Sequence, residues 1–598
     1  MNNDYAHENI KQELLIKLNS KESEKLMKRD ILKLLMIFYS IIIILLNTYG
    51  CQLRAEKPPD KRPTESLMQF DHYHSITEVE TFLQAVATRH KDLATLIEIG
   101  RSRAQRPIYA VEINNPATGK AHEKPAFYLD GNIHGGEVLS GEGALYVINL
   151  LLERYESDAD IRELVDTRAF FIIPIVNPDG REISVARGEN HRWNIRPFDE
   201  DNDGRVDEDP PDDLDGDGRI LRMRVEDPKG QWKVSSADER LMVRRSRGET
   251  GGTYYKMYSE GIDNDHDGQF NEDIAGGIDV NRNFPSNWHP AQFASGPYPL
   301  SEPESHALVE YITSRPNIAA VHTFHTSGGM ILRFPTLGDQ DWEFPAADIR
   351  DYNEIAQRGA EITGYDNYAN EKKKIVDRMN PGHGVFNDWA SNIFGVLAMT
   401  TEMWKQPGGR GQGTLDWNDR ELGGKGFINW YPFQHPQLGE VELGGWDRFL
   451  LSNAPEPLMA KELERNAQWV LSFAERLPRV VIVDAQAQKS TRQLDLIEIV
   501  AQVANTGWMA TATEHAEKVL RIAKPVTVIL TLENAELAGT NNIVELGVLP
   551  GARENGPVEV PVSWLVKVVD SDQPAFAEII ATSEKAGVAR RRIDLRNR

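Results

Sequence analysis

The chain has 598 residues, of which 40% are hydrophobic and 26% are charged, as is typical of folded proteins rather than disordered ones. Its formal net charge of -24 argues against a nucleic-acid partner, because a polyphosphate would be repelled. The single cysteine, Cys51, excludes an internal disulfide and a zinc site built from several thiolates. This length is enough for two or three domains.

The first predicted element, residues 1–51, is an export segment. Three basic residues precede an apolar stretch: Lys28, Arg29 and Lys33. The stretch runs from Leu34 to Leu46 and is followed by a short tail that ends in a Gly-Cys pair at Cys51. This order is typical of a secretory signal, and the Gly-Cys pair resembles the end of a bacterial lipoprotein signal, in which the cysteine is lipidated. The alternative is a membrane-spanning anchor, for which the apolar stretch is short.

The segment also bears on the location of the protein and on its true start. Met27 would be an ordinary first residue for such a signal, so residues 1–26 are interpreted as a mis-assigned extension or a short cytosolic tail. We expect export, with the protein either secreted or lipid-anchored in the cell envelope. Contact with a membrane is expected only through this N-terminal lipid or signal anchor.

Residues 52–70 are polar and contain several prolines, which is typical of a linker. From residue 71 to residue 478, apolar strand-like runs alternate with segments of helical spacing. Strands are expected at 107–113, 125–133, 169–176, 319–326, 330–334 and 395–403. Helices are expected at 76–90, 137–155, 303–314 and 384–394. This alternation predicts an α/β domain, with a mixed central sheet covered by helices on both faces.

The pattern changes after residue 478. Short β-type runs with turn residues between them follow at 479–488, 494–507, 525–533, 542–549 and 561–569. Residues 479–598 are therefore predicted to form a separate all-β sandwich domain.

An acidic insertion, residues 197–276, repeats the pattern D-x-D-x-D-G three times. Alternate carboxylates around a glycine turn can enclose a hard cation, so a structural calcium ion is predicted. No copy has Glu at its twelfth position, so none is an EF-hand, and the alternative is a solvated acidic loop. The candidate calcium ligands are Asp199, Asp201, Asp203, Asp213, Asp215, Asp217, Asp263, Asp265 and Asp267.

A candidate metal site begins at the end of the strand expected at 125–133. His134 is the only one of the fifteen histidines with a glutamate three residues later, Glu137. That pair alone is weak evidence of a metal site. The strand at 319–326 adds His322 and His325 on opposite faces, with residue 325 at its end. Two histidines and one glutamate form a known catalytic zinc set that leaves a fourth position for water.

Five motifs in the same order resemble those of the zinc carboxypeptidase family. They are GNIHGGE (131–137), NPDG (177–180), GIDVNRNFP (277–285), HTSGGMILRFP (325–335) and DWASNIFGVLAMTTE (388–402). The resemblance covers roughly residues 70 to 410. It implies a carboxypeptidase-like fold, one zinc ion per chain, and a peptide or protein substrate with a free C-terminus.

The resemblance also implies a role for each matching residue. His134, Glu137 and His325 would bind the zinc, while Asp279 would orient a ligand histidine. Asn281 and Arg282 would hold the C-terminal carboxylate of the substrate, a task that suits the planar guanidinium of arginine. Glu402 would act first as general base and then as general acid. His322 is instead interpreted as a packed or hydrogen-bonded histidine.

Some positions depart from the family's pattern and put the substrate in doubt. Gly136 stands where the family often has arginine, and Asn380 where it has a tyrosine that closes over the substrate. Asn387 would lie at the base of the specificity pocket, although it is neither apolar nor acidic. The arginine that helps to bind the oxyanion could be Arg192 or Arg196, and the sequence does not decide between them.

Two alternatives to a peptide-hydrolysing carboxypeptidase remain open. The enzyme could remove a residue from peptidoglycan stem peptides, which envelope location would favour. The chain could instead be a calcium-dependent surface binding protein on an inactive peptidase scaffold. Retention of all three ligand residues and of Glu402 argues against inactivity.

Overall fold

The computed structural model describes residues 66–188, 190–197, 204–206, 212–266, 268–271, 277–333, 344–367, 382–409, 411–491, 493 and 495–596. The described helices and strands belong to Leu67–Arg598, which forms one compact unit separate from Met1–Ser66. The predicted export segment, with Cys51, lies outside the described residues, as do Asp199, Asp201, Asp203, Asp267 and Asn380. No helix within the described ranges is both long and apolar enough to cross a membrane.

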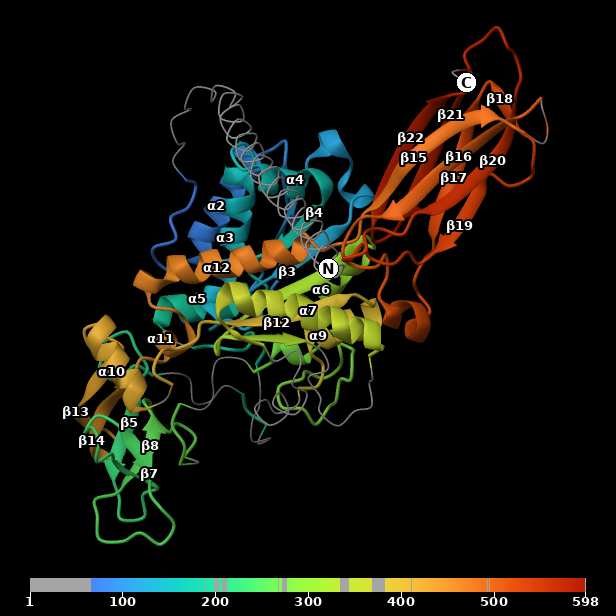
Figure 1. Cartoon of the computed structure of the whole chain (residues 1–598). Helices are drawn as coiled ribbons and strands as arrows, with labels where there is room; N and C mark the ends of the chain where they lie inside the picture. Colours follow the sequence, from blue (N-terminus) through green and yellow to red (C-terminus); the bar gives the residue numbers. More distant parts are fainter. Residues whose placement is uncertain are drawn as a thin grey trace, which may run out of the picture. The chain divides into compact units, whose positions relative to one another are not determined.

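The core of the first domain is a central sheet, of which Figure 1 labels β3, β4 and β12. It has eight strands in the order β1-β2-β4-β3-β9-β12-β10-β11. Its strands are β1 (Ala94–Arg101), β2 (Pro107–Ile113), β3 (Ala126–Asp130), β4 (Ala169–Ile173), β9 (Ile318–Thr326), β10 (Met330–Arg333), β11 (Asp366–Asn367) and β12 (Leu397–Met403). Strands β4, β3, β9 and β12 run parallel, whereas β1 and β2 pair antiparallel with their neighbours. Strand β10 pairs antiparallel with β12 and parallel with β11. The prediction of a mixed central sheet is confirmed.

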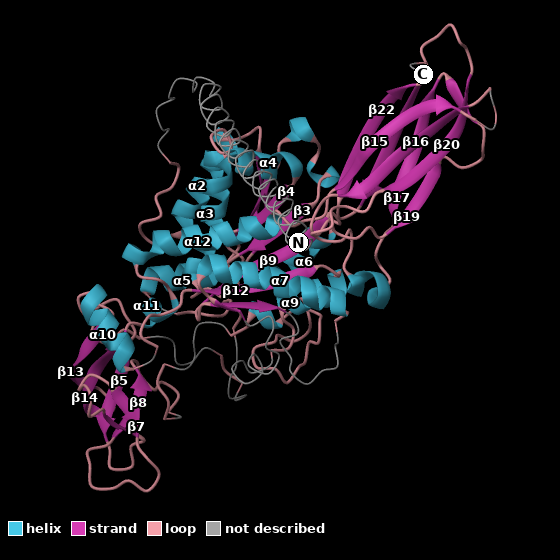
Figure 2. Cartoon of the chain, in the orientation of Figure 1, coloured by secondary structure: helices cyan, strands magenta, loops and turns pink. Residues whose placement is uncertain are grey.

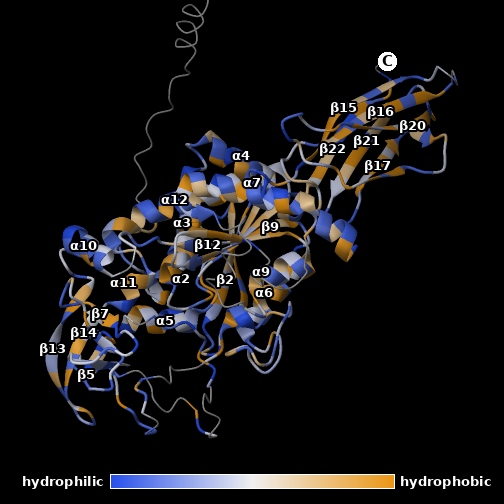
Figure 3. Cartoon of the chain, turned by 60° about the horizontal axis from the view of Figure 1, so that its bottom comes forward, coloured by the Kyte–Doolittle hydropathy of each residue, from blue (hydrophilic) through white to orange (hydrophobic). Residues whose placement is uncertain are grey.

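Helices cover both faces of this sheet (Figure 2). One face packs against α2 (Ile76–Arg89), α3 (Val138–Arg154), α4 (Ala159–Thr167), α7 (Ala346–Thr363) and α12 (Glu456–Ala474). The opposite face packs against α6 (Pro303–Thr313) and α9 (Phe386–Trp389). Every residue of β3, β4 and β9 is buried, because a parallel strand covered on both sides has no solvent-facing side chains. Figure 3 shows the resulting apolar centre around β9.

A second sheet was not predicted from the sequence. It is antiparallel, with the order β13-β14-β5-β8-β6-β7, and it combines two segments that lie far apart in the chain. Its strands are β5 (Arg222–Glu226), β6 (Trp232–Val234), β7 (Met242–Arg244), β8 (Tyr255–Ser259), β13 (Phe427–His435) and β14 (Gly439–Trp446). The pairing of β14 with β5 joins the two segments, so the acidic insertion contributes four strands, β5 to β8, to this sheet.

The C-terminal region contains two four-stranded antiparallel sheets, β15-β16-β20-β18 and β19-β17-β21-β22, around one hydrophobic core. The strands are β15 (Val480–Lys489), β16 (Ile497–Asn505), β17 (Val526–Glu533), β18 (Ala535–Leu537), β19 (Ile543–Gly547), β20 (Val560–Val568), β21 (Phe576–Ser583) and β22 (Gly587–Asp594). Buried positions alternate along β21, as expected of a strand with one face toward a core. The prediction of an all-β C-terminal region is confirmed.

Candidate metal centre and active site

The loop between β3 and α3 carries two of the predicted ligands, His134 and Glu137, and internal hydrogen bonds fix its shape. Asn132 adopts a left-handed conformation with φ 57°. Its side-chain amide donates to the carbonyl of His134 at 2.7 Å and to that of Gly135 at 3.0 Å. The hydroxyl of Ser140, in the first turn of α3, accepts the backbone N–H of Asn132 at 2.8 Å. The turn therefore holds both side chains before any ligand binds.

The three predicted zinc ligands converge. One carboxylate oxygen of Glu137 lies 2.8 Å from His134 Nδ1, and the other lies 2.9 Å from His325 Nδ1. The two Nδ1 atoms are 3.1 Å apart, and all three residues are buried. Bonds of about 2.0–2.1 Å in a tetrahedral zinc site would place ligand atoms about 3.3 Å apart. The donor set and its spacing therefore fit one zinc ion.

Asp279 supports this cluster from behind. It caps the short helix η3 (Val280–Arg282), and its Oδ1 lies 3.2 Å from His134 Nε2, the ring nitrogen that faces away from Glu137. Burial opposes its ionisation, but the charges of Arg192 and His134 outweigh burial and hold the pKa of Asp279 well below its usual range. An ionised Asp279 keeps a proton on Nε2 and leaves Nδ1 free to bind a metal.

Of the two candidate oxyanion arginines, only Arg192 lies at the cluster. Its Nε donates to Asp279 Oδ2 at 2.9 Å, and its Nη1 lies 3.6 Å from Glu137 Oε1. Arg196 instead donates to the buried Glu302 at 2.6 Å. Arg192 retains an exposed side-chain fraction of 34%, so its guanidinium is both anchored and reachable. The arrangement favours Arg192.

Asn281 and Arg282 lie in η3, two and three residues after Asp279, the carboxylate that supports the metal cluster. The side-chain oxygen of Asn281 accepts the backbone N–H of Phe386 at 2.9 Å, which fixes the amide relative to α9. The guanidinium of Arg282 lies against Gly382, where an added Cβ would be 2.9 Å from Cζ. Burial, the largest influence, lowers the pKa of Arg282 from its ordinary value.

Glu402 lies on β12 directly opposite His325 of β9 and Met330 of β10. Burial, reinforced by the charge of Glu137, raises the pKa of Glu402 to about 7, although His325 and the two arginines oppose the shift. Among the described residues no side chain forms a hydrogen bond with its carboxylate. The sheet register therefore brings a carboxylate of raised pKa beside the metal cluster.

The structure shows the surroundings of two positions that depart from the family's pattern, 136 and 387. An added Cβ at Gly136 would lie 2.0 Å from Asn190 Oδ1 and 2.8 Å from its carbonyl carbon, so this loop has no room for arginine. Asn387 is buried, and its side-chain amide contacts the hydroxyl of Thr400, while its oxygen has no partner in the described part of the chain. The role of Asn387 in substrate preference stays a prediction.

His322 and a buried arginine complete the surroundings of the site. His322 is buried, with Nε2 3.1 Å from the hydroxyl of Thr401, in agreement with its interpretation as a packed residue. The sequence analysis missed Arg181, which is fully buried and donates to Asn132 Oδ1 at 3.0 Å and to Glu142 Oε1 at 2.5 Å. Arg181 thus supports the turn that carries His134. Its place directly after NPDG was the available signal.

The structure describes parts of the acidic insertion, residues 197–276, and they include the second of its three D-x-D-x-D-G copies in whole and most of the third. Asp213, Asp215 and Asp217 are exposed, and one oxygen of each lies within 4.8 Å of the others. Asp213 accepts the backbone N–H groups of Gly216 and Gly218 at 2.8 and 2.7 Å, which closes a tight loop. In the third copy of the pattern, Asp263 accepts the backbone N–H of Gly268 at 3.1 Å. Binding of calcium by these residues stays a prediction.

Comparison with known proteins gives two family matches. Residues 79–412 match the family described as zinc carboxypeptidase, and residues 479–594 match a domain of unknown function. A zinc carboxypeptidase of Saccharothrix mutabilis subsp. capreolus is 34% identical over 122 residues, which is 20% of this chain and 28% of that protein. Carboxypeptidase D of Anas platyrhynchos is 35% identical over 118 residues, 20% of this chain and 8% of that protein.

The chain therefore spans less than a third of the length of these curated relatives. Among solved structures, the carboxypeptidase A from Helicoverpa armigera aligns with a TM-score of 0.42 and 19% identity. That alignment covers 69% of this chain and 76% of the other.

Proposed function

Because the chain belongs to the zinc carboxypeptidase family, we propose that it hydrolyses the C-terminal peptide bond of peptides or proteins. The observation that carries this proposal is the convergence of His134, Glu137 and His325. A carboxylate of raised pKa and two arginines surround the three side chains. These are the groups that metal-assisted hydrolysis of a substrate ending in a carboxylate requires.

His134, Glu137 and His325 would hold the metal through two ring nitrogens and a carboxylate. Zinc bound there would supply a Lewis acid that polarises the scissile carbonyl and lowers the pKa of water. Asp279 fixes the ring of His134 through Nε2, so that Nδ1 faces the cluster. Arg192 adds a positive charge beside Glu137, where negative charge on the substrate's carbonyl oxygen would be stabilised.

Glu402 would move the protons. A carboxylate with an ordinary pKa of about 4.3 is a weak base toward bulk water, whose pKa is about 15.7. The raised pKa of Glu402 makes its carboxylate a stronger base, which reduces the difference in pKa between Glu402 and the water that it must deprotonate. In the proposed reaction, one carboxylate oxygen accepts a proton from water and later donates it to the nitrogen of the leaving residue. The same group therefore serves as base and then as acid.

Arg282 and Asn281 would bind the terminal carboxylate, which makes the enzyme an exopeptidase. Arg282→Ala should lower kcat/KM for free-acid peptides by about 30-fold to several thousand-fold, because losing a charge-assisted contact at a partly desolvated site costs about 2–5 kcal/mol. The measurement is hydrolysis of one peptide with a free and with an amidated C-terminus. Arg420→Ala, which removes an arginine with a 66% exposed side chain, serves as control and should retain wild-type rates.

The native enzyme should also discriminate strongly between the two peptides. Equal cleavage of the free-acid and amidated forms would contradict carboxypeptidase activity, although another metallopeptidase activity would remain possible. A screen of C-terminally varied peptides and peptidoglycan stem peptides, with and without a chelator, separates the main proposal from its two alternatives. Inactivity toward all of them would favour a surface binding protein.

We further propose that the acidic insertion binds calcium as a structural ion. Clustered carboxylates such as Asp213, Asp215 and Asp217 repel one another without a cation, so calcium should tighten the loop. Saturating calcium should raise the melting temperature by mass action and protect the insertion from proteolysis. The measurement is thermal unfolding and limited proteolysis with calcium and with EGTA, compared with Asp213→Asn. Unchanged melting and cleavage in calcium would leave this segment a solvated acidic loop.

A further inference from the structure

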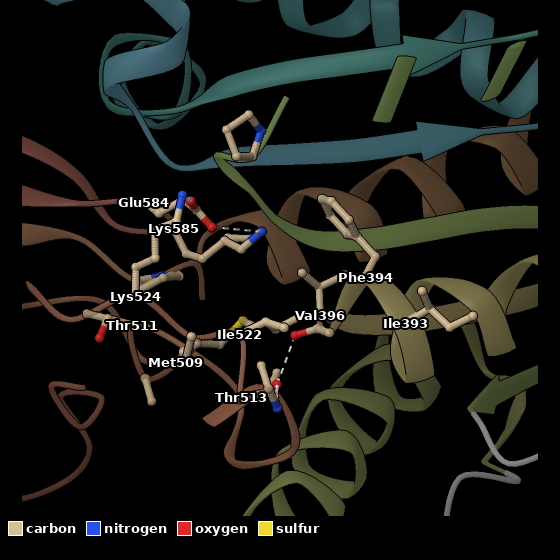
Figure 4. Close-up of a pocket in the computed structure, with 18 residues that line it drawn as sticks. Ile393, Phe394, Val396, Met509, Thr511, Thr513, Ile522, Lys524, Glu584 and Lys585 are labelled. Atoms are coloured by element: carbon tan, nitrogen blue, oxygen red, sulfur yellow. Dashed lines mark hydrogen bonds and ion pairs between the residues drawn. The ribbon is translucent and has the colours of Figure 1, made fainter. Parts of the chain in front are cut away.

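A cavity of about 190 Å³ lies away from the metal centre, where the α/β domain meets the C-terminal sandwich. Its wall from the α/β domain includes the apolar segment 393–396, which precedes β12. Its opposite wall comes from residues 509–523 and from the turn between β21 and β22. Figure 4 shows Phe394, Val396, Met509 and Ile522 around the space. Most of the lining is apolar, so the cavity would favour an apolar ligand body.

One end of this cavity is charged. The ammonium of Lys524 forms an ion pair with one carboxylate oxygen of Glu584 at 2.5 Å, whereas the ammonium of Lys585 lies 4.0 Å from the other oxygen. Lys585 instead lies over the ring of Phe394, 4.3 Å from its centroid. The side chain of Lys585 is only 16% exposed, against 68% for Lys524. The two lysines and one glutamate leave one positive charge in excess, carried by the lysine that faces the apolar wall.

Lys585 shares Glu584 with Lys524, which lies closer to it, so this ion pair replaces only part of the hydration that the Lys585 ammonium loses on burial. In agreement, burial lowers the pKa of Lys585 to about 8. The cation–π contact with Phe394 offsets part of this cost, but it supplies no anionic acceptor. An anion in the cavity would therefore recover interaction energy that Lys585 lacks in the protein alone.

The volume limits the size of such an anion. A cavity of about 150 Å³ with apolar walls is large enough to hold benzene. A volume of about 190 Å³ therefore accommodates a phenyl ring or a short alkyl chain with a small head group. Ile393 and Ile522, which line the cavity, are 47% and 48% exposed, so a small ligand can enter past them.

We propose that this cavity binds a small monocarboxylate, with its phenyl or short alkyl body against Phe394 and Val396 and its carboxylate on Lys585. An α-amino acid released by peptide hydrolysis would bring the same carboxylate, but also an ammonium next to two lysines. The excess positive charge therefore favours an acid without an amino group. The inference concerns a site apart from the metal centre and does not depend on the proposed peptidase activity.

Isothermal titration calorimetry of the full chain with 3-phenylpropanoate tests the proposal. Binding should be at least tenfold tighter for 3-phenylpropanoate than for its amide, for acetate or for phenylalanine. Lys585→Met preserves the length and apolar stem of the side chain and should weaken binding at least tenfold. Ile522→Trp, at the exposed mouth, should hinder entry and weaken binding by a separate route. Lys567→Met, a lysine of β20 that does not line the cavity, serves as matched control.

The far-UV spectrum and melting temperature of each variant establish that it is folded before it is titrated. Tighter binding of phenylalanine than of 3-phenylpropanoate would overturn the ligand class and point to a released amino acid. Three results would contradict the proposed site. They are equal binding of the acid and its amide, unchanged binding by Lys585→Met, and no binding of 3-phenylpropanoate at a concentration on the order of 10 mM. Peptide hydrolysis is measured separately, and its absence would not bear on these results.

Discussion

A His134→Ala variant should be isolated without zinc and without peptidase activity. Removing the imidazole leaves Glu137 and His325 as the two protein ligands, which make a poor zinc site. Loss of a group that merely supports a ligand costs about 10–100-fold in metal affinity, so loss of a ligand itself should cost more. The measurement is zinc per chain by elemental analysis after dialysis, beside hydrolysis of a free-acid peptide.

Two matched variants sharpen this experiment. His306→Ala removes an exposed histidine on α6 and should leave zinc at one per chain. Asp279→Asn keeps the ligands but removes the charge behind His134 Nε2, so zinc affinity should fall by about 10–100-fold without being abolished. A His134→Ala protein that still carried one zinc per chain would show that the ligand set is wrongly assigned.

Much of the central sheet was predictable because its signals are local. The run at 169–176 is apolar throughout, as is typical of a strand buried on both faces, and the run at 319–326 combines apolar residues with two histidines and two threonines. The positions of His134 and His325 at the ends of predicted strands also followed from the sequence. Their meeting at 3.1 Å required the parallel pairing of β3 with β9, which the family resemblance implied and periodicity alone did not.

The second sheet could not be predicted for the opposite reason. Its strands are short, and β5 and β14 become neighbours only through a pairing across about two hundred residues. Neither strand is a long apolar run. Met223 of β5 and Leu443 of β14 belong to a small hydrophobic cluster, so few positions of these strands need to be apolar. Within the acidic insertion, the repeated aspartates predict loops, whereas the alternation in β5 and β8 is too brief to predict strands.

The choice between Arg192 and Arg196 illustrates the same limit within the site. Only three residues lie between the two in sequence, and both carry the same charge. Arg196 donates to Glu302 at the start of α6 and so lies away from the metal cluster. Arg192 donates to Asp279, which lies beside the cluster. Both partners are distant in sequence, so the role of each arginine depends on tertiary contacts that no local pattern contains.

The proton carrier is tested by Glu402→Gln. Glutamine preserves the shape of the side chain but cannot accept a proton from water at neutral pH. Glu402 is not among the three converging metal ligands, so this variant should keep one zinc per chain and bind substrate normally. Turnover should fall by at least the 10²–10⁴-fold typical of a lost general base. The loss should be larger if the same group must also protonate the leaving amine.

The pair of variants therefore separates the two kinds of residue. His134→Ala and Glu402→Gln should both be inactive, yet only Glu402→Gln should contain zinc. Thr400→Ser, two residues earlier on β12, controls for disturbance of the strand and should keep most of the activity. Loss of zinc from Glu402→Gln would make Glu402 a ligand, contrary to its place outside the cluster. Near-native turnover would mean that another group takes the proton, and the raised pKa of Glu402 would then reflect only its burial and the nearby charge of Glu137.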